Sequence, residues 1–180
     1  MKDKNLIFLD IDGVFNCQLF FEGQKHRDYK EAKKQLRKAV KSKEIERLEF
    51  YQSQICKERL GWFNQLCEET NSVVVLSSTW RKIEGIEEIL KQCGATFQLV
   101  GKTGQCNCGT RGCEIQKWLE ENCKAMFNIG YFDFYRYAII DDDSDMLLNQ
   151  APHFFQTDNY SGLTPSTCYK VKQFLTKKTF

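Results

Sequence analysis

The chain has few prolines, few histidines and no long hydrophobic segment. Of its 180 residues, two are proline and two are histidine, and no apolar run approaches the ~18 residues that a membrane-spanning helix needs. The scarcity of proline argues against a linker between domains, so we expect a single domain over residues 1–180. His26 and His153 lie far from any second metal-ligand pattern, which argues against a histidine-based zinc site.

An excess of one charge is also absent, because the formal net charge is only +2. The chain starts with a short polar segment that leads directly into an apolar run, without the pattern of a signal peptide. We therefore expect a cytoplasmic protein that does not enter membranes. The sequence leaves the oligomeric state open.

Cysteine, in contrast, is abundant, with nine residues. The number is odd and no export signal is present, so we do not expect a disulfide framework. Most of the cysteines stand at apolar positions of helical patterns and are expected to be small buried hydrophobes. Cys106, Cys108 and Cys113 differ, because they cluster in a glycine-rich stretch. The usual paired knuckles of a zinc site are missing there, so we favour a reduced loop over structural Zn²⁺.

Apolar segments alternate with helical patterns along the chain. Continuous apolar runs at 6–9, 73–76 and 137–140 predict strands that are buried on both faces. Shorter strands are predicted at 96–100 and 153–157, and amphipathic patterns between the strands predict helices. This alternation predicts an α/β, Rossmann-like fold with a parallel sheet and helices on both faces.

A long polar segment follows the first predicted strand. From Lys25 to Lys43 it holds nine Lys or Arg residues against two acids, and its apolar residues recur at helical spacing. We interpret residues 16–56 as a small basic helical insertion, or cap, within the domain. Its basic side chains either form a solvated helix face or attract a polyanion such as a nucleic acid toward a nearby site.

Polar side chains follow the ends of three predicted strands. Asp10 and Asp12 come after the first strand, Ser77 after the second, and Asp141 and Asp142 after the third. Ligands bind at the carboxyl ends of parallel strands, so these groups converge if the three strands are neighbours. One carboxylate can then attack phosphorus, a second can transfer protons, and the acids of the third strand can complete a Mg²⁺ site.

In this order the motifs resemble those of the haloacid dehalogenase (HAD) superfamily of aspartate-nucleophile phosphatases. With h for an apolar residue, hhhhDxDG spans Leu6–Gly13, hhhS spans Val74–Ser77 and hhhhDD spans Tyr137–Asp142. The resemblance covers nearly the whole chain. Three shorter strings are similar to the small HAD branch of RNA-repair-type proteins, whose relatives include polynucleotide phosphatases. They lie at 76–81, 111–119 and 157–164.

The resemblance implies a role for each motif residue. It implies Asp10 as the nucleophile and Asp12 as the general acid and base. Ser77 is implied to bind the phosphate through its hydroxyl group. The Mg²⁺ would be held by the side chain of Asp10, the backbone carbonyl of Asp12, and one or both of Asp141 and Asp142.

The cation of the third HAD motif has two candidates. Arg111 precedes an amphipathic helical pattern and matches the RNA-repair branch, whereas Lys117 lies one turn into that helix. We favour Arg111 as the catalytic cation and keep Lys117 as a substrate-binding candidate. Gly13, Ser78 and Arg81 are the other candidates for binding the substrate.

These residues predict a Mg²⁺-dependent phosphomonoester hydrolase that uses an aspartyl-phosphate intermediate. The basic segment favours a phosphorylated nucleotide or nucleic-acid end as the substrate. Two alternatives stay open, namely a phosphatase of small sugar or metabolite phosphates and a HAD-fold binding or regulatory protein without turnover. The second alternative is disfavoured because every catalytic position carries a competent residue type.

Overall fold

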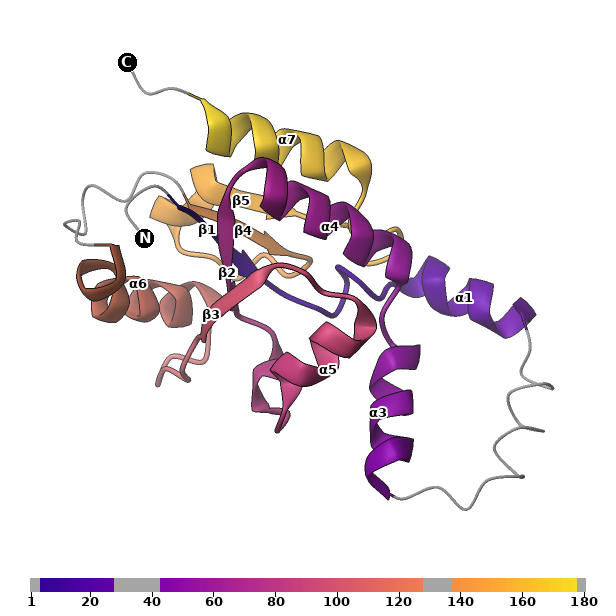
Figure 1. The fold of residues 1–180 in the computed structure, drawn as a ribbon. Helices are drawn as coiled ribbons and strands as arrows, with labels where there is room; N and C mark the ends of the chain where they lie inside the picture. The colour runs from indigo at the N-terminus through magenta and orange to yellow at the C-terminus, as the bar shows by residue number, and fades with distance from the viewer. Residues whose placement is uncertain (1–3, 28–42, 128–136, 178–180) are drawn as a thin grey trace.

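The computed structural model describes residues 4–27, 43–127 and 137–177. Among these residues, five parallel strands form one sheet in the order β3-β2-β1-β4-β5 (Figure 1). The first strand of the chain therefore lies at the centre of the sheet, between the two strands that carry the other motifs. The strands are β1 (Asn5–Leu9), β2 (Ser72–Leu76), β3 (Gln98–Lys102), β4 (Tyr137–Asp141) and β5 (Phe154–Gln156).

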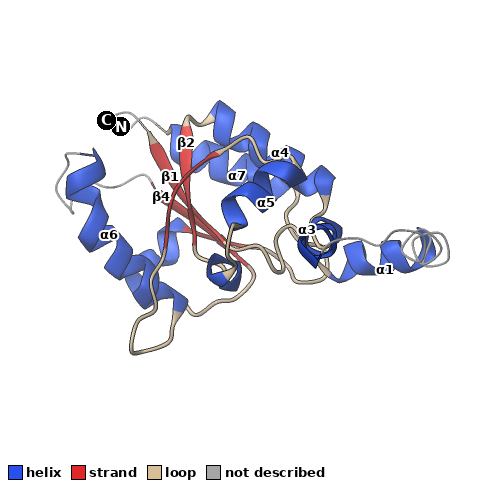
Figure 2. Cartoon of the chain, turned by 60° about the horizontal axis from the view of Figure 1, so that its bottom comes forward, coloured by secondary structure: helices blue, strands red, loops and turns tan. Residues whose placement is uncertain are grey.

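Helices cover both faces of the sheet, as the sequence predicts. Figure 2 shows α6 on one side of the strands and α4, α5 and α7 on the other. Two further helices, α1 and α3, stand beyond this body, between β1 and α4 in the chain (Figure 1). The helices are α1 (Gln18–Arg27), α3 (Lys43–Ser53), α4 (Lys57–Glu69), α5 (Ile86–Cys93), α6 (Arg111–Phe127) and α7 (Pro165–Thr176).

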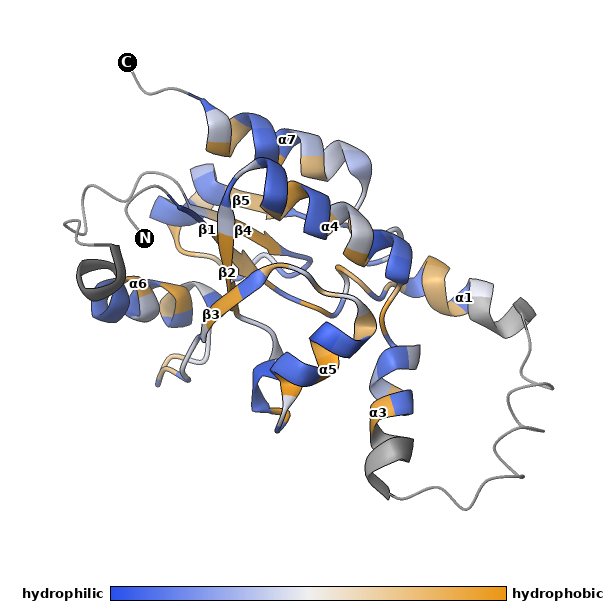
Figure 3. Cartoon of the chain, in the orientation of Figure 1, coloured by the Kyte–Doolittle hydropathy of each residue, from blue (hydrophilic) through white to orange (hydrophobic). Residues whose placement is uncertain are grey.

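The apolar core has two layers because successive side chains of a strand point to opposite faces. Ile7 and Leu9 of β1 join a cluster with residues of α4, α5 and α7. Leu6 and Phe8 join a second cluster with residues of α6, where the ring of Phe8 meets Trp118 edge to face at 5.5 Å. Burial on both faces explains why β1, β2 and β4 consist mainly of apolar runs, as the orange of β2 in Figure 3 illustrates.

Several element boundaries follow from local chemistry. The last helix begins at a hydrogen-bonded cap, since the Thr164 hydroxyl accepts a hydrogen bond from the Thr167 amide at 3.1 Å and Pro165 occupies the first turn. The strand expected at 96–100 begins two residues later, at Gln98. The strand expected at 153–157 is shorter, because a 3₁₀ turn extends to His153.

The insertion between β1 and α4 contains α1 and α3, and α3 packs against α5. Leu48 and Tyr51 of α3 are partly buried against the main core. Most of the basic segment, residues 28–42, lies outside the described residues. Among the described helices, none combines the length and apolar character that crossing a bilayer requires.

Candidate active site

The carboxyl end of β1 places Asp10 between the ends of its two neighbouring strands. The Asp10 amide donates to the carbonyl of Ile140 in β4 at 3.0 Å, and the Ser77 amide donates to the carbonyl of Leu9 at 2.9 Å. These hydrogen bonds continue the sheet by one residue beyond each strand. As a result, the polar residues that follow the three strands lie side by side, as the motif order predicts.

Arg111, the first residue of α6, reaches the acids at the carboxyl ends of β1 and β4. Its Nη2 atom lies 3.3 Å from Asp10 Oδ1, and its Nε atom lies 3.2 Å from Asp141 Oδ2. The Arg111 amide donates to Asp145 Oδ2 at 2.7 Å, which fixes the start of the helix. Glu114, one turn later, has Oε2 3.8 Å from Arg111 Nη1. One guanidinium group is therefore shared by carboxylates from two strand ends.

Burial opposes ionisation of the acids in this cluster. Burial, and secondly the charge of Asp141, raises the pKa of Asp10 to about 8, although Arg111 and a hydrogen bond from Ser78 act in the opposite direction. Burial also raises the pKa of Asp141 to about 6 and raises the pKa of Asp142. A bound cation would stabilise these carboxylates in their charged form.

The same three acids offer a suitable donor set for a hard divalent cation. Carboxylate oxygens of Asp10, Asp141 and Asp142 all lie within 4.8 Å of one another, and Mg²⁺ prefers oxygen ligands of this kind. Gly13 makes room for this arrangement, because a Cβ atom at this position would collide with the Asp142 carboxylate. Its φ of +67° is also in the left-handed region that favours glycine. The residues present therefore fit a Mg²⁺ ion.

A buried hydroxyl group lies next to the acids. Ser77 is fully buried, and its Oγ has no hydrogen-bond partner among the described residues. Leaving such a group unsatisfied costs roughly 1–3 kcal/mol, so an acceptor such as a phosphoryl oxygen would be bound favourably. Ser78, also fully buried, has a different contact, since its Oγ accepts from the amide of Trp80 at 3.3 Å.

Asp12 is held by neutral donors and is exposed. The indole Nε1 of Trp80 lies 3.1 Å from both of its carboxylate oxygens, and Asn16 Nδ2 donates to Oδ1 at 2.8 Å. The hydroxyl of Thr79 adds a longer contact of 3.4 Å. Tyr51 of α3 packs edge to face on the Trp80 ring at 5.4 Å, so the insertion touches the residue that orients Asp12.

Three other candidates have contacts that bear on their predicted roles. The Arg81 guanidinium donates to the carbonyl of Ser77 at 2.8 Å and forms an ion pair with Glu114 at 2.7 Å, so much of its donor capacity supports the fold. The Gly13 amide donates to Asn16 Oδ1 at 3.0 Å. Binding of substrate by Arg81, Gly13 and Ser78 stays a prediction.

The contacts of the two candidate cations favour Arg111 over Lys117 as the group that would neutralise the phosphate. Lys117 is 53 % exposed and pairs with Glu121 at 3.8 Å, one turn further along α6. Arg111 instead contacts Asp10 and Asp141 directly. A guanidinium that touches both acids is better placed to neutralise a phosphoryl group there.

Sequence reasoning overlooked the residues that orient the motif side chains. Trp80 and Asn16 hold Asp12, and Glu114 pairs with both Arg81 and Arg111. Two of these contacts are local, since Asn16 is four residues from Asp12 and Glu114 is three residues from Arg111. The contacts of Trp80 with Asp12 and of Arg81 with Glu114 join residues far apart in the chain, so no local pattern identifies those partners.

Two hollows flank the cluster of acids. One, of about 510 Å³, is lined by both arginines and by residues of the cysteine-rich loop, among them Cys106 and Asn107. The other, of about 590 Å³, lies on the side of α1, where Asp12 and Asp142 meet Phe21 and Gln54. Asp12 and Asp142 thus open onto a space that a substrate can enter.

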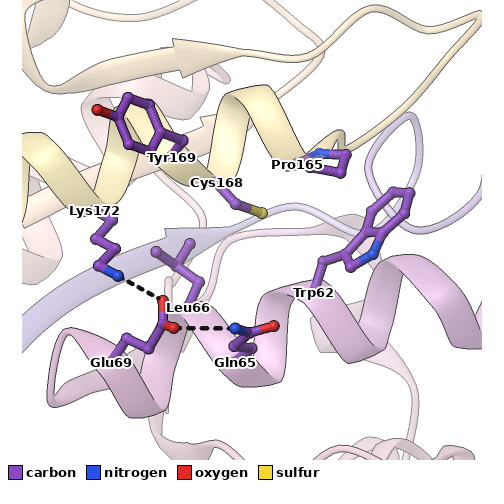
Figure 4. Close-up of a pocket in the computed structure, with 8 residues that line it drawn as sticks. All are labelled: Trp62, Gln65, Leu66, Glu69, Pro165, Cys168, Tyr169 and Lys172. Atoms are coloured by element: carbon purple, nitrogen blue, oxygen red, sulfur yellow. Dashed lines mark hydrogen bonds and ion pairs between the residues drawn. The ribbon is translucent and has the colours of Figure 1, made fainter.

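A third groove, of about 270 Å³, lies between α4 and α7 (Figure 4). It is crossed by an ion pair between Lys172 and Glu69 at 3.1 Å, and Gln65 donates to the same Glu69 at 3.0 Å. None of the motif residues lines it. This groove is therefore not part of the candidate active site.

The comparisons with known proteins agree with this geometry. A model of the family described as the HAD domain in Swiss Army Knife RNA repair proteins matches residues 6–168. The search of curated proteins and the search of solved structures found no match. The matched range contains all three strand-end motifs and Arg111, and it supports a phosphatase of the HAD type. The chain therefore belongs to the family of HAD domains of Swiss Army Knife RNA repair proteins.

Proposed function

We propose that this protein is a Mg²⁺-dependent phosphomonoesterase that acts on a phosphorylated nucleotide or nucleic-acid end through a phosphorylated Asp10. The observation that carries the proposal is the meeting of Asp10, Asp141 and Arg111 beside the Ser77 hydroxyl, which has no hydrogen-bond partner in the part of the chain that the structure describes. This arrangement combines a nucleophile, a cation and a donor for phosphoryl oxygens. A bound Mg²⁺ would be held by Asp10, Asp141 and Asp142 and would supply positive charge to the phosphate.

The reaction proceeds in two displacements at phosphorus. A carboxylate oxygen of Asp10 forms a bond to phosphorus while the bond to the leaving oxygen breaks, and the carboxyl group of Asp12 donates its proton to that oxygen. The Asp12 carboxylate then takes a proton from a water molecule, which attacks phosphorus as the bond to Asp10 breaks. Arg111 and Ser77 stabilise the charge on the phosphoryl oxygens in both steps.

The substrate class is supported by the family and by the hollow beside Asp12. The family is described by its occurrence in RNA repair proteins. The hollow on the side of α1 is lined by the amides Gln18, Gln54 and Asn159 and by the ring of Phe21. Amides can pair with the edges of a nucleobase and an aromatic ring can stack on its face. We propose that residues 16–56 act as a cap that contributes this wall.

A screen with and without Mg²⁺ tests the proposal. The panel contains oligonucleotides with 3′- or 5′-phosphates, mononucleotides and sugar phosphates. We expect release of phosphate from nucleotide or oligonucleotide ends only with Mg²⁺, and, for oligonucleotides, a steep rise of KM with salt. Exclusive turnover of sugar phosphates would contradict the substrate class, and no turnover in the whole panel would favour a binding protein.

A further inference from the structure

Three thiol groups meet beside the arginine-lined hollow, and one of them, that of Cys106, lines it. Cys106 and Cys108 belong to the loop between β3 and α6, and Cys113 lies in the first turn of α6. Their Sγ atoms all lie within 4.8 Å of one another, and those of Cys106 and Cys108 are 2.9 Å apart. Other cysteines in the described part of the chain, such as Cys67 and Cys93, are buried in the apolar core instead.

The loop is folded so that its thiols converge. Gly109 has a φ of +70°, and its amide donates to the carbonyl of Cys106 at 3.1 Å, which closes a tight turn. Thr110 lies against both loop thiols, with its carbonyl 3.6 Å from Cys106 Sγ and its hydroxyl 3.5 Å from Cys108 Sγ. The chain then enters α6 directly, which brings Cys113 back to the same point.

All three thiols can be reached from solvent. Cys108 is exposed and Cys106 and Cys113 are half-buried. The thiolate is the form of cysteine that binds a metal, and this exposure leaves the three sulfurs accessible to an ion from solvent.

The number and spacing of the thiols fit a zinc ion better than a disulfide. A disulfide joins two sulfurs, whereas here a third sulfur lies in the same small space. Zinc–sulfur bonds of ~2.3 Å in a tetrahedral site place sulfur atoms roughly 3.8 Å apart. Thiolates also select Zn²⁺ over Mg²⁺, so this cluster and the acids of the active site would bind different ions.

We propose that Cys106, Cys108 and Cys113 form a Zn²⁺ site with three thiolate ligands. No fourth His, Cys, Asp or Glu joins the cluster within the residues that the structure describes, so a solvent molecule completes the coordination. Cys113 lies two residues after Arg111, in the first turn of α6. The ion therefore links the loop that lines the hollow to the helical turn that carries the catalytic cation. This site does not depend on the proposed phosphatase function.

The test measures binding of Zn²⁺ and Co²⁺ to the full chain after reduction and removal of metals. We expect one equivalent of Zn²⁺ in competition with a chromophoric chelator, and a Co²⁺ spectrum with the charge-transfer band of thiolate ligands and the visible bands of tetrahedral cobalt. Cys113→Ser and Cys106→Ser should each weaken Zn²⁺ binding by more than the ~10–100-fold that loss of a second-shell partner costs.

Two matched variants assign the bound ion to the cluster. Cys168→Ser removes a half-buried thiol from the groove between α4 and α7 and should leave Zn²⁺ affinity unchanged. Asp141→Asn alters the proposed Mg²⁺ site and should also keep the thiolate band of Co²⁺. Circular dichroism of each variant verifies that it is folded, so that lost binding reports on the lost ligand.

Several results would overturn the proposal. Reduced protein that takes up no Zn²⁺ at micromolar concentration, or a Cys113→Ser variant that binds as tightly as the parent, would contradict it. A Cys106–Cys108 disulfide found by mass spectrometry, together with no Zn²⁺ uptake after reduction, would assign these two residues to redox chemistry. All readouts are binding or spectroscopy, so their failure is distinct from a failure of the phosphatase assay.

Discussion

Asp10 and Asp12 are one residue apart, yet their carboxylates are held in different ways. Asp10 is 4 % exposed and forms an ion pair with Arg111 in a cluster of buried acids. Asp12 is exposed and accepts hydrogen bonds from the neutral side chains of Trp80 and Asn16. Burial and Asp141 raise the pKa of Asp10, so Arg111 and a bound cation would be needed to keep this nucleophile and metal ligand ionised. The donors around Asp12 orient its carboxylate at the edge of the hollow, where it can exchange protons with a substrate.

Replacement of the buried carboxylate should have the largest effect. Asp10→Asn keeps the shape of the side chain but removes the nucleophile, so we expect kcat to fall by at least about 10⁴-fold. Phosphate release under single-turnover conditions measures this loss, and circular dichroism verifies the fold. Glu68→Gln, which changes an exposed acid on α4, is the matched control and should keep full activity. Near-normal turnover of Asp10→Asn in a clean preparation would exclude Asp10 as the nucleophile.

Replacement of Arg111, the cation that contacts Asp10, should have the second-largest effect on activity. Arg111→Lys keeps the positive charge but loses the forked donors that reach both Asp10 and Asp141. We expect kcat to fall by about 10²–10³-fold, the usual cost of losing one donor to transition-state charge. Lys117→Ala, the rival cation, should change kcat little. If the two variants exchanged these outcomes, the assignment of the cation to Arg111 would be wrong.

Loss of one hydrogen-bond donor to the exposed Asp12 should have a smaller effect, and it should act on kcat rather than on KM. Trp80→Phe removes the indole N–H that lies 3.1 Å from both oxygens of Asp12. A hydrogen bond to a charged group contributes ~1.5–3 kcal/mol, so we expect kcat to fall by roughly 10–100-fold with little change in KM. Trp62→Phe, in the distant groove between α4 and α7, is the control.

A comparison of substrates with different leaving groups distinguishes a positioning role for Trp80 from a general loss of structure. An aryl phosphate leaves without help from an acid, whereas an alkyl phosphate needs the proton from Asp12. The defect of Trp80→Phe should therefore be smaller with p-nitrophenyl phosphate than with an alkyl phosphate. An equal defect in kcat/KM, which reports on the displacement that phosphorylates Asp10, would show that Trp80 does not act through Asp12 as the acid.

The smallest expected effect is a change in thermal stability. Burial raises the pKa of Asp10 from its usual 3.8 to about 8, so ionisation of this carboxyl group in the folded state weakens folding. Without metal, the contribution of Asp10 to the free energy of unfolding should be largest below about pH 4. This contribution should fall as the pH rises toward about 8. Bound Mg²⁺ should reverse this loss, because it favours the ionised acids.

Thermal unfolding with and without Mg²⁺ measures this effect. At about 100 times the Kd, Mg²⁺ should stabilise the fold by about 2.7 kcal/mol, which corresponds to a rise in Tm of roughly 5–10 °C for a chain of this size. The rise should be larger at about pH 8 than at about pH 5 and absent in Asp141→Asn. An equal rise in Asp141→Asn would place the ion elsewhere.

The sequence predicted the fold and the main motif positions because both depend on local patterns. The apolar runs of β1, β2 and β4 are buried on both faces, and this burial produces a signal that is readable from residue types alone. The convergence of Asp10, Ser77 and Asp141 follows from parallel strands that are neighbours in the sheet. The family match then confirmed the resemblance that those motifs carried.

The supporting contacts could not be predicted in the same way. Trp80 reaches Asp12 across 68 positions of the chain, and Arg81 reaches Glu114 across 33. Such pairs depend on where a 3₁₀ turn and a helix are placed against the sheet, and no local pattern encodes that placement. Similarly, the spacing of Cys106, Cys108 and Cys113 lacks paired knuckles, and only the turn at Gly109 brings the thiols together.

Covalent phosphorylation of Asp10 is the central claim, and trapping the intermediate tests it most directly. Turnover is stopped by rapid acid quench, the protein is reduced with borohydride, and its peptides are analysed by mass spectrometry. An aspartyl phosphate is reduced to homoserine, so we predict homoserine at position 10, formed only with substrate and Mg²⁺. Homoserine at another acid such as Asp12 or Asp141, or no trapped residue while the enzyme turns over, would contradict the account.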